Sequence, residues 1–365
     1  MTTYQKNDAQ MTRGLAILCM VILHLFCRTG NDVLGTPLMW INESTPVVYL
    51  FGFFAEICVP LYSICVGYAQ ELLHRANRSD FRSRSTRILR LMINYWIILG
   101  IFAILGLIFD SDHGMPGSVK DFAKSIVLLH SYNGAWWYLN TYVLLMLLPP
   151  ALLLLPVEKL TLVPGLLVCG SFHVIWYALG KLGITSALSF DSPILQFVQK
   201  EANNLIGVLA YIWVGGFLCK YDVVARLSMR YEQKVPKPKQ KIILFLLASV
   251  VFVVTNVVHK WVIMGGVALL VFLIFNIWPK SKYTEKIMLW LGKHSTNIWL
   301  VHMFFYAYFL KDFVLRCRYP VLMLASLFAL SILTSYVVMY LNRLIIEVLE
   351  HRRKARYDNK DNNMS

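Results

Sequence analysis

Charged residues are scarce in this sequence. Only 15% of its 365 residues are Asp, Glu, Lys or Arg, whereas 58% are hydrophobic. Soluble globular domains carry about 25% charged and about 45–50% apolar residues. The composition therefore excludes an ordinary soluble enzyme, and the high hydrophobicity also excludes an intrinsically disordered chain.

The sequence also lacks the short motifs of several enzyme classes. It has no GxxxxGK[ST] loop, no GxGxxG fingerprint, no GxSxG nucleophile elbow and no HExxH zinc pair. No His is followed by Asp five positions later, so the motif of soluble glycerolipid acyltransferases is missing as well. The seven Cys form no CxxC pair and lie mostly within apolar segments. We therefore expect neither a metal site nor a disulfide framework.

Long apolar runs occupy most of the chain. A membrane-spanning helix needs about 20 predominantly apolar residues. Unbroken runs such as Ile242–Val258 exclude a transmembrane β-barrel, in which hydrophobicity alternates with a period of two. We therefore predict an all-α integral membrane protein with about ten transmembrane helices. The ten segments are approximately 14–33, 47–70, 88–109, 137–155, 160–180, 204–221, 242–258, 262–278, 294–310 and 320–345.

Lys and Arg are distributed unevenly among the predicted loops. If the N-terminus is cytoplasmic, the loops and ends on that side contain 26 of the 35 Lys and Arg residues, and the other side contains 9. By the positive-inside rule, both termini are then cytoplasmic. The net charge of +15 accordingly reflects topology and indicates no nucleic-acid partner. We expect one transmembrane domain over residues 1–349 and a basic, disordered cytoplasmic tail over residues 350–365.

Ionisable side chains within a membrane span are costly, so each is a candidate functional residue. The first span has Arg13 at its entrance and His24 inside it, eleven residues further on. On a helix this spacing is three turns plus about 20°, so both side chains share one face, about 16 Å apart. The structural alternative is a snorkelling Arg and a core His bonded to a neighbouring carbonyl.

Glu56 lies in the second span at a depth comparable to that of His24. A carboxylate beside an imidazole would orient the ring and stabilise its charged form. One hypothesis is therefore a His24–Glu56 pair. The alternative is that Glu56 bonds another helix or faces a water-filled cavity. His173 in the fifth span and His302 in the ninth are further candidates, and Arg90 lies near the start of the third span.

The loop after the second span contains six Arg between positions 75 and 90, with Asp80 as its one acidic residue. Because Arg suits a bidentate grip on phosphate, this loop is a candidate docking site for a cytosolic phosphorylated cofactor. Positive-inside charge with anionic lipid contacts is the plainer explanation. Trp136 and Trp137 open the fourth span at the outer interface, where aromatic belts are common.

Four stretches resemble the acyltransferase family 3 membrane proteins, and they are spread over about residues 11–305. Three positions depart from the family pattern: Ser63, Val66 and Trp299 stand where the family has Phe, Ser and Tyr. The matching stretches are Arg13-Gly-Leu-Ala with His24, Val59-Pro-Leu-Tyr62 with Gly67-Tyr68 and the Arg82-Ser-Arg84…Arg87 run, Trp136-Trp-Tyr-Leu139, and Leu291-Gly-Lys-His-Ser295 with Ile298-Trp-Leu-Val-His302.

The resemblance implies transfer of an acyl group, usually acetyl, from cytoplasmic acyl-CoA to a hydroxyl of an extracytoplasmic or lipid-linked sugar. It places the protein among membrane lipids, in the inner membrane of a bacterium. The site residues that we assign on this basis are His24, Glu56 and His302 for catalysis, Arg13, Arg82, Arg84, Arg87 and Arg90 for acyl-CoA (acetyl-CoA), and Trp136 and Trp137 for the acceptor.

Two other functions remain open at this point. A transporter or exporter of a lipid-linked glycan or a small solute would use the same intramembrane His, Glu and Arg as a substrate path. Against it, the sequence shows no paired halves, which mark many transporters. A structural or partner subunit would leave the buried polar residues without a purpose.

Overall fold

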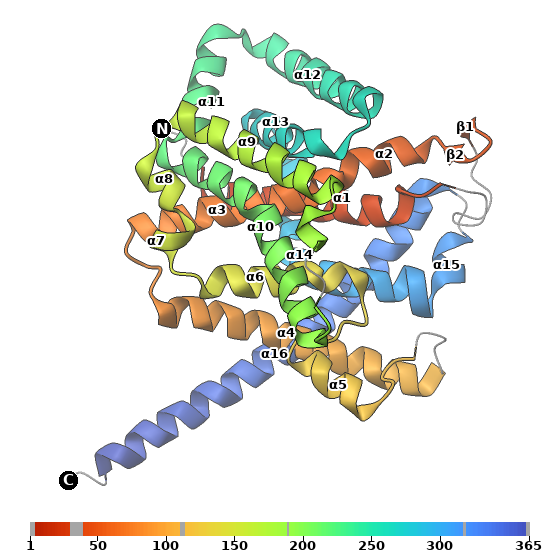
Figure 1. Cartoon of the computed structure of the whole chain (residues 1–365), viewed down its shortest axis with the longest axis vertical. Coiled ribbons are helices and arrows are strands. Elements are labelled where there is room, and N and C mark those ends of the chain that lie inside the picture. Colours follow the sequence, from red (N-terminus) through yellow and green to blue (C-terminus); the bar gives the residue numbers. More distant parts are fainter. Residues whose placement is uncertain (1–3, 30–38, 110–113, 188–189, 317–318, 363–365) are drawn as a thin grey trace.

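The computed structural model describes residues 4–29, 39–109, 114–187, 190–316 and 319–362, and nearly all of these are helical (Figure 1). The described strands, β1 (Trp40–Asn42) and β2 (Thr45–Pro46), form one short antiparallel hairpin. The predicted all-α class is therefore confirmed.

The α-helices follow one another along the chain with short connections. A π-helix (Phe304–Phe309) extends α14, and 3-10 turns occupy Ala55–Ile57, Gly134–Trp136, Ile184–Ser186 and Trp261–Ile263. The helices are α1 (Lys6–Phe26), α2 (Val48–Phe54), α3 (Cys58–Arg75), α4 (Phe81–Phe109), α5 (Val119–Ile126), α6 (Trp137–Leu147), α7 (Pro150–Leu153), α8 (Leu155–Lys159), α9 (Leu162–Lys181), α10 (Pro193–Lys220), α11 (Val223–Lys234), α12 (Lys237–Val258), α13 (Met264–Ile277), α14 (Lys282–Met303), α15 (Lys311–Leu315) and α16 (Pro320–Asn362).

Within the described residues, seven helical stretches are long and apolar enough to cross a membrane. The chain is therefore an integral membrane protein with several membrane-spanning helices. The stretches are Lys6–Phe26, Val48–Arg75, Phe81–Phe109, Leu162–Lys181, Pro193–Lys220, Lys237–Val258 and Pro320–Val348.

The other three predicted spans are helical but differ from long apolar helices. The segment 137–155 is divided among α6, α7 and α8, because Pro149 and Pro150 interrupt the backbone hydrogen bonds. The segment 262–278 coincides with the shorter apolar stretch Trp261–Ile277, and 294–310 joins the end of α14 to the π-helix. The count of ten spans and the cytoplasmic position of both termini stay predictions.

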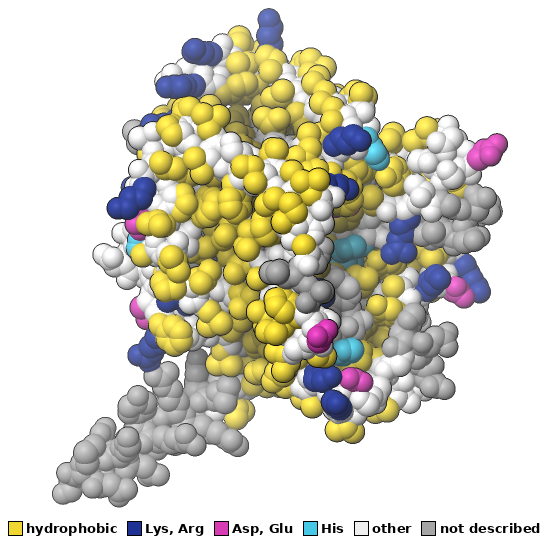
Figure 2. All heavy atoms as spheres, in the orientation of Figure 1, with side chains coloured by type: hydrophobic (Ala, Val, Ile, Leu, Met, Phe, Trp, Pro, Cys, Tyr) yellow, Lys and Arg dark blue, Asp and Glu magenta, His cyan; other side chains and the backbone are white. Residues whose placement is uncertain are grey.

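The exterior of the bundle is apolar. Figure 2 shows hydrophobic side chains over the middle of one face, with Lys and Arg mainly near its margins. Large apolar side chains such as Leu107 and Val257 are 72% and 78% exposed. Such a surface would be unstable in water but suits the hydrocarbon interior of a bilayer.

The C-terminal region differs from the prediction. We expected residues 350–365 to be disordered, but α16 continues to Asn362 and projects away from the bundle (Figure 1). Residues 363–365 lie outside the described residues. The segment after Leu349 reads Glu-His-Arg-Arg-Lys-Ala-Arg, which is rich in good helix formers. A polar composition therefore does not prevent this segment from extending a helix that is already nucleated in the membrane.

The close contact between α1 and α14 determines where His24 and His302 lie. At Gly14 an added Cβ would collide with the backbone carbonyl of Met288, and at Gly292 with that of Gln10. Two glycines thus allow the helix backbones to touch. His24 and His302 each lie ten residues further along their helices, about 15 Å away. The two helices run parallel, so the glycine contact brings the histidines side by side.

The 3-10 turn before α6, Gly134–Trp136, also holds α14 in place. The Trp136 indole Nε1 donates to the backbone carbonyl of Leu300 at 3.0 Å, and the Trp299 indole donates to the carbonyl of Ala135 at 2.9 Å. These reciprocal hydrogen bonds hold the last turns of α14, which contain His302, in one position.

We predict that Gly14→Ala forces α1 and α14 apart. Overpacking of this kind costs about 1–3 kcal/mol, so the thermal unfolding midpoint in detergent should fall. Gly100→Ala on α4 is the control, because nothing lies within 4 Å of its added Cβ. Replacing this helical glycine should be neutral or stabilising by about 0.5–1 kcal/mol. Equal midpoints for both variants would show that the glycine contact does not hold the helices.

Candidate functional site: two cavities around a pair of histidines

His24 on α1 and His302 on α14 are hydrogen-bonded to each other. The distance between His24 Nδ1 and His302 Nε2 is 2.8 Å, and the rings stack with centroids 4.9 Å apart. His302 is fully buried, while His24 is half-buried and lines a cavity. Sequence reasoning identified both residues but not their contact.

The hydrogen bonds of His302 fix the proton positions of the pair. Its Nδ1 lies 3.0 Å from the carbonyl oxygen of Ile298 and 2.8 Å from that of Trp299. A carbonyl only accepts, so Nδ1 carries the proton and, in the neutral ring, Nε2 is an acceptor. His24 must then donate through Nδ1–H. We therefore assign a lone pair to His24 Nε2, for which the described residues provide no hydrogen-bond donor.

Arg28 secures the end of α1 that carries His24. Its guanidinium donates to the carbonyl of His24 at 3.1 Å through Nε and to the Tyr306 hydroxyl at 2.9 Å through Nη2. Tyr306 belongs to the π-helix that follows His302. Such π-helical turns occur frequently at functional sites. From the sequence, Arg28 is one of the nine Lys and Arg residues on the non-cytoplasmic side, and no motif predicts this contact.

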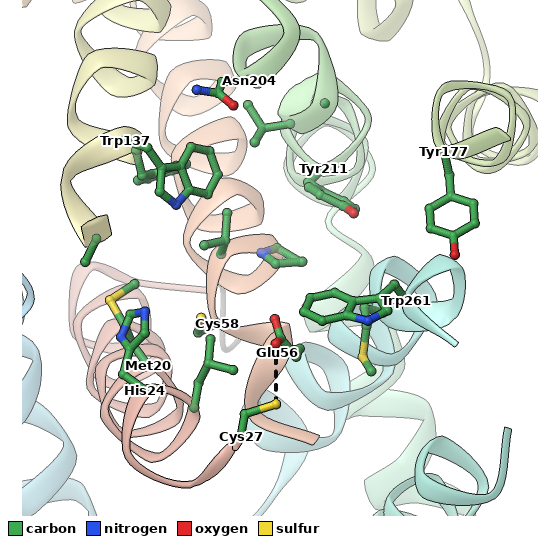
Figure 3. Close-up of a pocket in the computed structure, with 18 of the residues that line it drawn as sticks. Met20, His24, Cys27, Glu56, Cys58, Trp137, Tyr177, Asn204, Tyr211 and Trp261 are labelled. Atoms are coloured by element: carbon green, nitrogen blue, oxygen red, sulfur yellow. Dashed lines mark hydrogen bonds between the residues drawn. The ribbon is translucent and has the colours of Figure 1, made fainter. Parts of the chain in front are cut away.

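The cavity beside His24, here called the histidine cavity, has a volume of about 790 Å³. It is enclosed mainly by α1, α3, α9 and α10. Figure 3 shows that aromatic side chains surround this space together with Glu56 and an amide. The polar and aromatic lining residues include His24, Glu56, Trp137, Tyr177, Asn204, Tyr211 and Trp261.

Glu56 lines the histidine cavity but does not pair with His24. Its carboxylate accepts a hydrogen bond from the Cys27 thiol at 3.7 Å, drawn as a dashed line in Figure 3. Glu56 lies on the 3-10 turn between α2 and α3, where three residues per turn rotate side chains differently from an α-helix. The proposed His24–Glu56 pair is therefore replaced by His24–His302 and Glu56–Cys27.

His173, the third predicted intramembrane histidine, also lines the histidine cavity. Its Nε2 is 3.0 Å from the carbonyl of Val262, so Nε2 carries the proton. Its Nδ1 then accepts from the Tyr211 hydroxyl at 3.2 Å. His173 thus fixes the orientation of Tyr211.

A second cavity, here called the arginine cavity, has a volume of about 630 Å³ and lies at the end of the bundle where α1 begins. It is lined by Lys6, Arg13, Arg87 and Arg90, along with Gln70 and Tyr142. Arg13 and Arg90 have no hydrogen bond or ion pair to the described residues. Three of the five predicted arginines therefore converge on one space.

The remaining two predicted arginines are placed elsewhere. Arg84 is buried and donates to the carbonyls of Met146, Leu147 and Leu148 at 3.0, 3.3 and 2.6 Å. It therefore satisfies the free carbonyls at the end of α6, which Pro149 and Pro150 would otherwise leave without donors. Arg82 is exposed and does not line the arginine cavity.

The two cavities share a wall made of Met20, Tyr138 and Trp299. Tyr138 is held by Ser63 through a hydroxyl–hydroxyl hydrogen bond of 2.9 Å, and Trp299 by its bond to Ala135. Met20 is unbranched and can change rotamer most easily. A group passing from the arginine cavity to His24 must pass these three side chains.

Of the two tryptophans predicted to bind the acceptor, only one lines a cavity. Trp137 lines the histidine cavity, whereas Trp136 does not and is 3% exposed, packed edge-on against Tyr95 and Phe304. Trp136 therefore belongs to the core. Among the residues that the structure describes, no three His, Cys, Asp or Glu side chains gather into a potential metal site.

The chain matches a known protein family along most of its length. The model of an acyltransferase domain, acyltransferase family 3, matches residues 8–340. Because the match covers nearly the whole chain, the protein belongs to this family of membrane acyltransferases. Neither the curated proteins nor the solved structures gave a match.

Proposed function

We propose that the protein transfers an acyl group, in the first place acetyl, from acyl-CoA to a hydroxyl of an extracytoplasmic or lipid-linked carbohydrate. The observation that supports this proposal is the His24–His302 pair. It leaves His24 Nε2 as a proton acceptor, close to the wall that separates a cationic cavity from an aromatic one. We further propose the inner membrane of a bacterium as its location.

The donor fits the arginine cavity. Acyl-CoA carries several phosphates, and Arg13, Arg87 and Arg90 offer guanidinium groups suited to phosphate oxygens. With the phosphates held there, the thioester end would reach the wall at Met20 and approach His24. We therefore propose Arg13, Arg87 and Arg90 for the donor and no longer propose Arg82 and Arg84 for that role.

The acceptor fits the histidine cavity. Aromatic rings pack against the apolar faces of a sugar, and amide groups form hydrogen bonds with its hydroxyls. The Asn204 amide nitrogen is buried without a partner and lines this cavity (Figure 3). A buried unpaired donor costs about 1–3 kcal/mol, which an acceptor oxygen of the substrate would relieve. Glu56 would accept from a second hydroxyl.

The reaction requires one proton to move twice. The acceptor hydroxyl donates to His24 Nε2, and its oxygen attacks the thioester carbonyl while His24 takes the proton. His302 accepts from His24 Nδ1–H and holds the ring as the charge develops. The carbon–sulfur bond then breaks, and the departing CoA thiolate receives the proton from His24.

We predict that His24→Ala abolishes acyl transfer while the protein still folds and binds CoA. Loss of a general base costs about 10²–10⁴-fold in rate. His302→Ala should also lower the rate, by up to about 10⁴-fold, because His24 loses the group that fixes its tautomer. The measurement is CoA release from acetyl-CoA by purified protein in nanodiscs, followed chromatographically.

His74→Ala is the control for these variants, since His74 lies outside both cavities and pairs with Glu158 at the surface. It should retain the wild-type rate. A folded His24→Ala protein with wild-type turnover would refute the mechanism. A wild-type protein that binds CoA but never consumes acetyl-CoA would favour the transporter.

A second prediction distinguishes the arginines that line the arginine cavity from Arg82 and Arg84. Arg13→Ala, Arg87→Ala and Arg90→Ala should each weaken CoA binding in titration calorimetry by about 1–3 kcal/mol, because each removes a charge-assisted contact to phosphate. Arg82→Ala should bind as wild type. Arg84→Ala should lower the unfolding midpoint, because three carbonyls lose their donor, with little change in CoA affinity. Unchanged CoA affinity in all three cavity variants would contradict the assigned donor site.

A further inference from the structure

A third cavity of about 400 Å³ lies between α4, α14 and α16, next to the arginine cavity. We call it the α16 cavity. It shares Arg90, Asn94 and Thr296 with the arginine cavity. Its other lining residues are Lys293, Asn297, Met339, Asn342, Arg343, Ile346 and Glu347.

The charges around the α16 cavity are mainly positive. Arg90, Lys293 and Arg343 carry three positive charges, and Glu347 carries one negative charge. Glu347 is 3.6 Å from Arg343, so it offsets part of the charge of that residue. Arg90 and Lys293 come from different helices and have no hydrogen bond or ion pair to the described residues. The cavity therefore has an excess of unpaired positive charge.

The floor of the cavity is a chain of amides. Asn297 Nδ2 donates to Ser335 Oγ at 3.0 Å and approaches the Ser335 carbonyl at 3.5 Å, which fixes the direction of the amide. Its oxygen accepts from Asn94 Nδ2 at 2.8 Å, and the Asn94 oxygen accepts from Asn342 Nδ2. The Asn342 oxygen is left as an acceptor without a partner among the described residues. The cavity therefore suits a ligand that has a hydroxyl for this oxygen and an anionic group for the cations.

Exposed aromatic side chains lie one helical turn from Lys293 on α14 and from Arg343 on α16. Trp290 on α14 and Tyr340 on α16 are 41% and 56% exposed, and the Arg343 guanidinium lies 5.8 Å from the Tyr340 ring centroid. Trp and Tyr concentrate at the headgroup level of membranes. Basic pockets between transmembrane helices at this level bind anionic lipid headgroups.

We propose that the α16 cavity binds the headgroup of an anionic phospholipid, with its phosphate at Lys293 and Arg343 and a headgroup hydroxyl donating to Asn342. Phosphatidylglycerol has both groups. A soluble phosphate ester would meet the same cations but would gain nothing from the exposed aromatic side chains. The proposal does not depend on the acyltransferase reaction, and its test uses no activity measurement.

The test is a titration of phosphatidylglycerol into the delipidated full-length protein in detergent, followed by the rise of the thermal unfolding midpoint. Near a membrane surface each Lys or Arg contributes about 1 kcal/mol to binding of anionic lipid, which corresponds to about fivefold in affinity. The double variant Lys293→Ala/Arg343→Ala should therefore shift the titration midpoint by about 25-fold. Lys239→Ala/Lys241→Ala, at the start of α12, removes the same charge elsewhere and should titrate as wild type.

Three results would overturn the proposal. The first is an unchanged titration for a Lys293→Ala/Arg343→Ala protein that unfolds at the wild-type temperature before lipid is added. The second is equal stabilisation by phosphatidylcholine, which has no net charge. The third is displacement of the lipid by glycerol 3-phosphate, which would assign the cavity to a soluble phosphate. If the double variant does not fold, Lys293→Gln/Arg343→Gln keeps the polar side chains and is titrated in its place, with the same shift expected.

Discussion

The direct contact between α1 and α14 determines where the functional groups lie. Two glycines let the helix backbones touch at one end, and two imidazoles meet ten residues further along. The contact has a chemical consequence, because the backbone carbonyls of α14 fix the tautomer of His302 and His302 fixes that of His24. The proton state of a residue on the first helix is thus set by the backbone of a helix almost 280 residues later.

Helix α1 also contributes to both cavities and to the wall that they share. α1 contributes Arg13 to the arginine cavity, His24 to the histidine cavity and Met20 to the wall between them. In the proposed reaction, the donor and the acceptor would bind on the two sides of this wall, with His24 beside it. Neither substrate would then need to cross the membrane. Tyr138 and Trp299 are held in place by hydrogen bonds, so of the three wall residues only Met20 would move for the thioester to approach His24.

The sequence was sufficient for the helical membrane class, and it indicated several of the residues that line the two cavities. Long apolar runs predict spans directly, and buried ionisable residues are rare enough to identify His24, Glu56 and His302. The partners of these residues could not be predicted, since a 3-10 turn at Glu56 and the register of α14 against α1 decide which groups meet. The arginines show the same limit. Arg84 and Arg87 are three positions apart, yet one caps α6 and the other lines a cavity, because only tertiary packing reveals the unpaired carbonyls after Leu145.

The central claim is that His24 is held as a neutral base with its proton on Nδ1. It can be measured by solid-state ¹⁵N NMR of histidine-labelled protein in lipid bilayers at neutral pH, with His24 assigned from the spectrum of a His24→Gln variant. The account predicts an unprotonated Nε2 and a protonated, hydrogen-bonded Nδ1 for His24, and loss of this single tautomer in His302→Ala. A His24 ring that is protonated on Nε2, or one whose spectrum is unchanged when His302 is replaced, would contradict it.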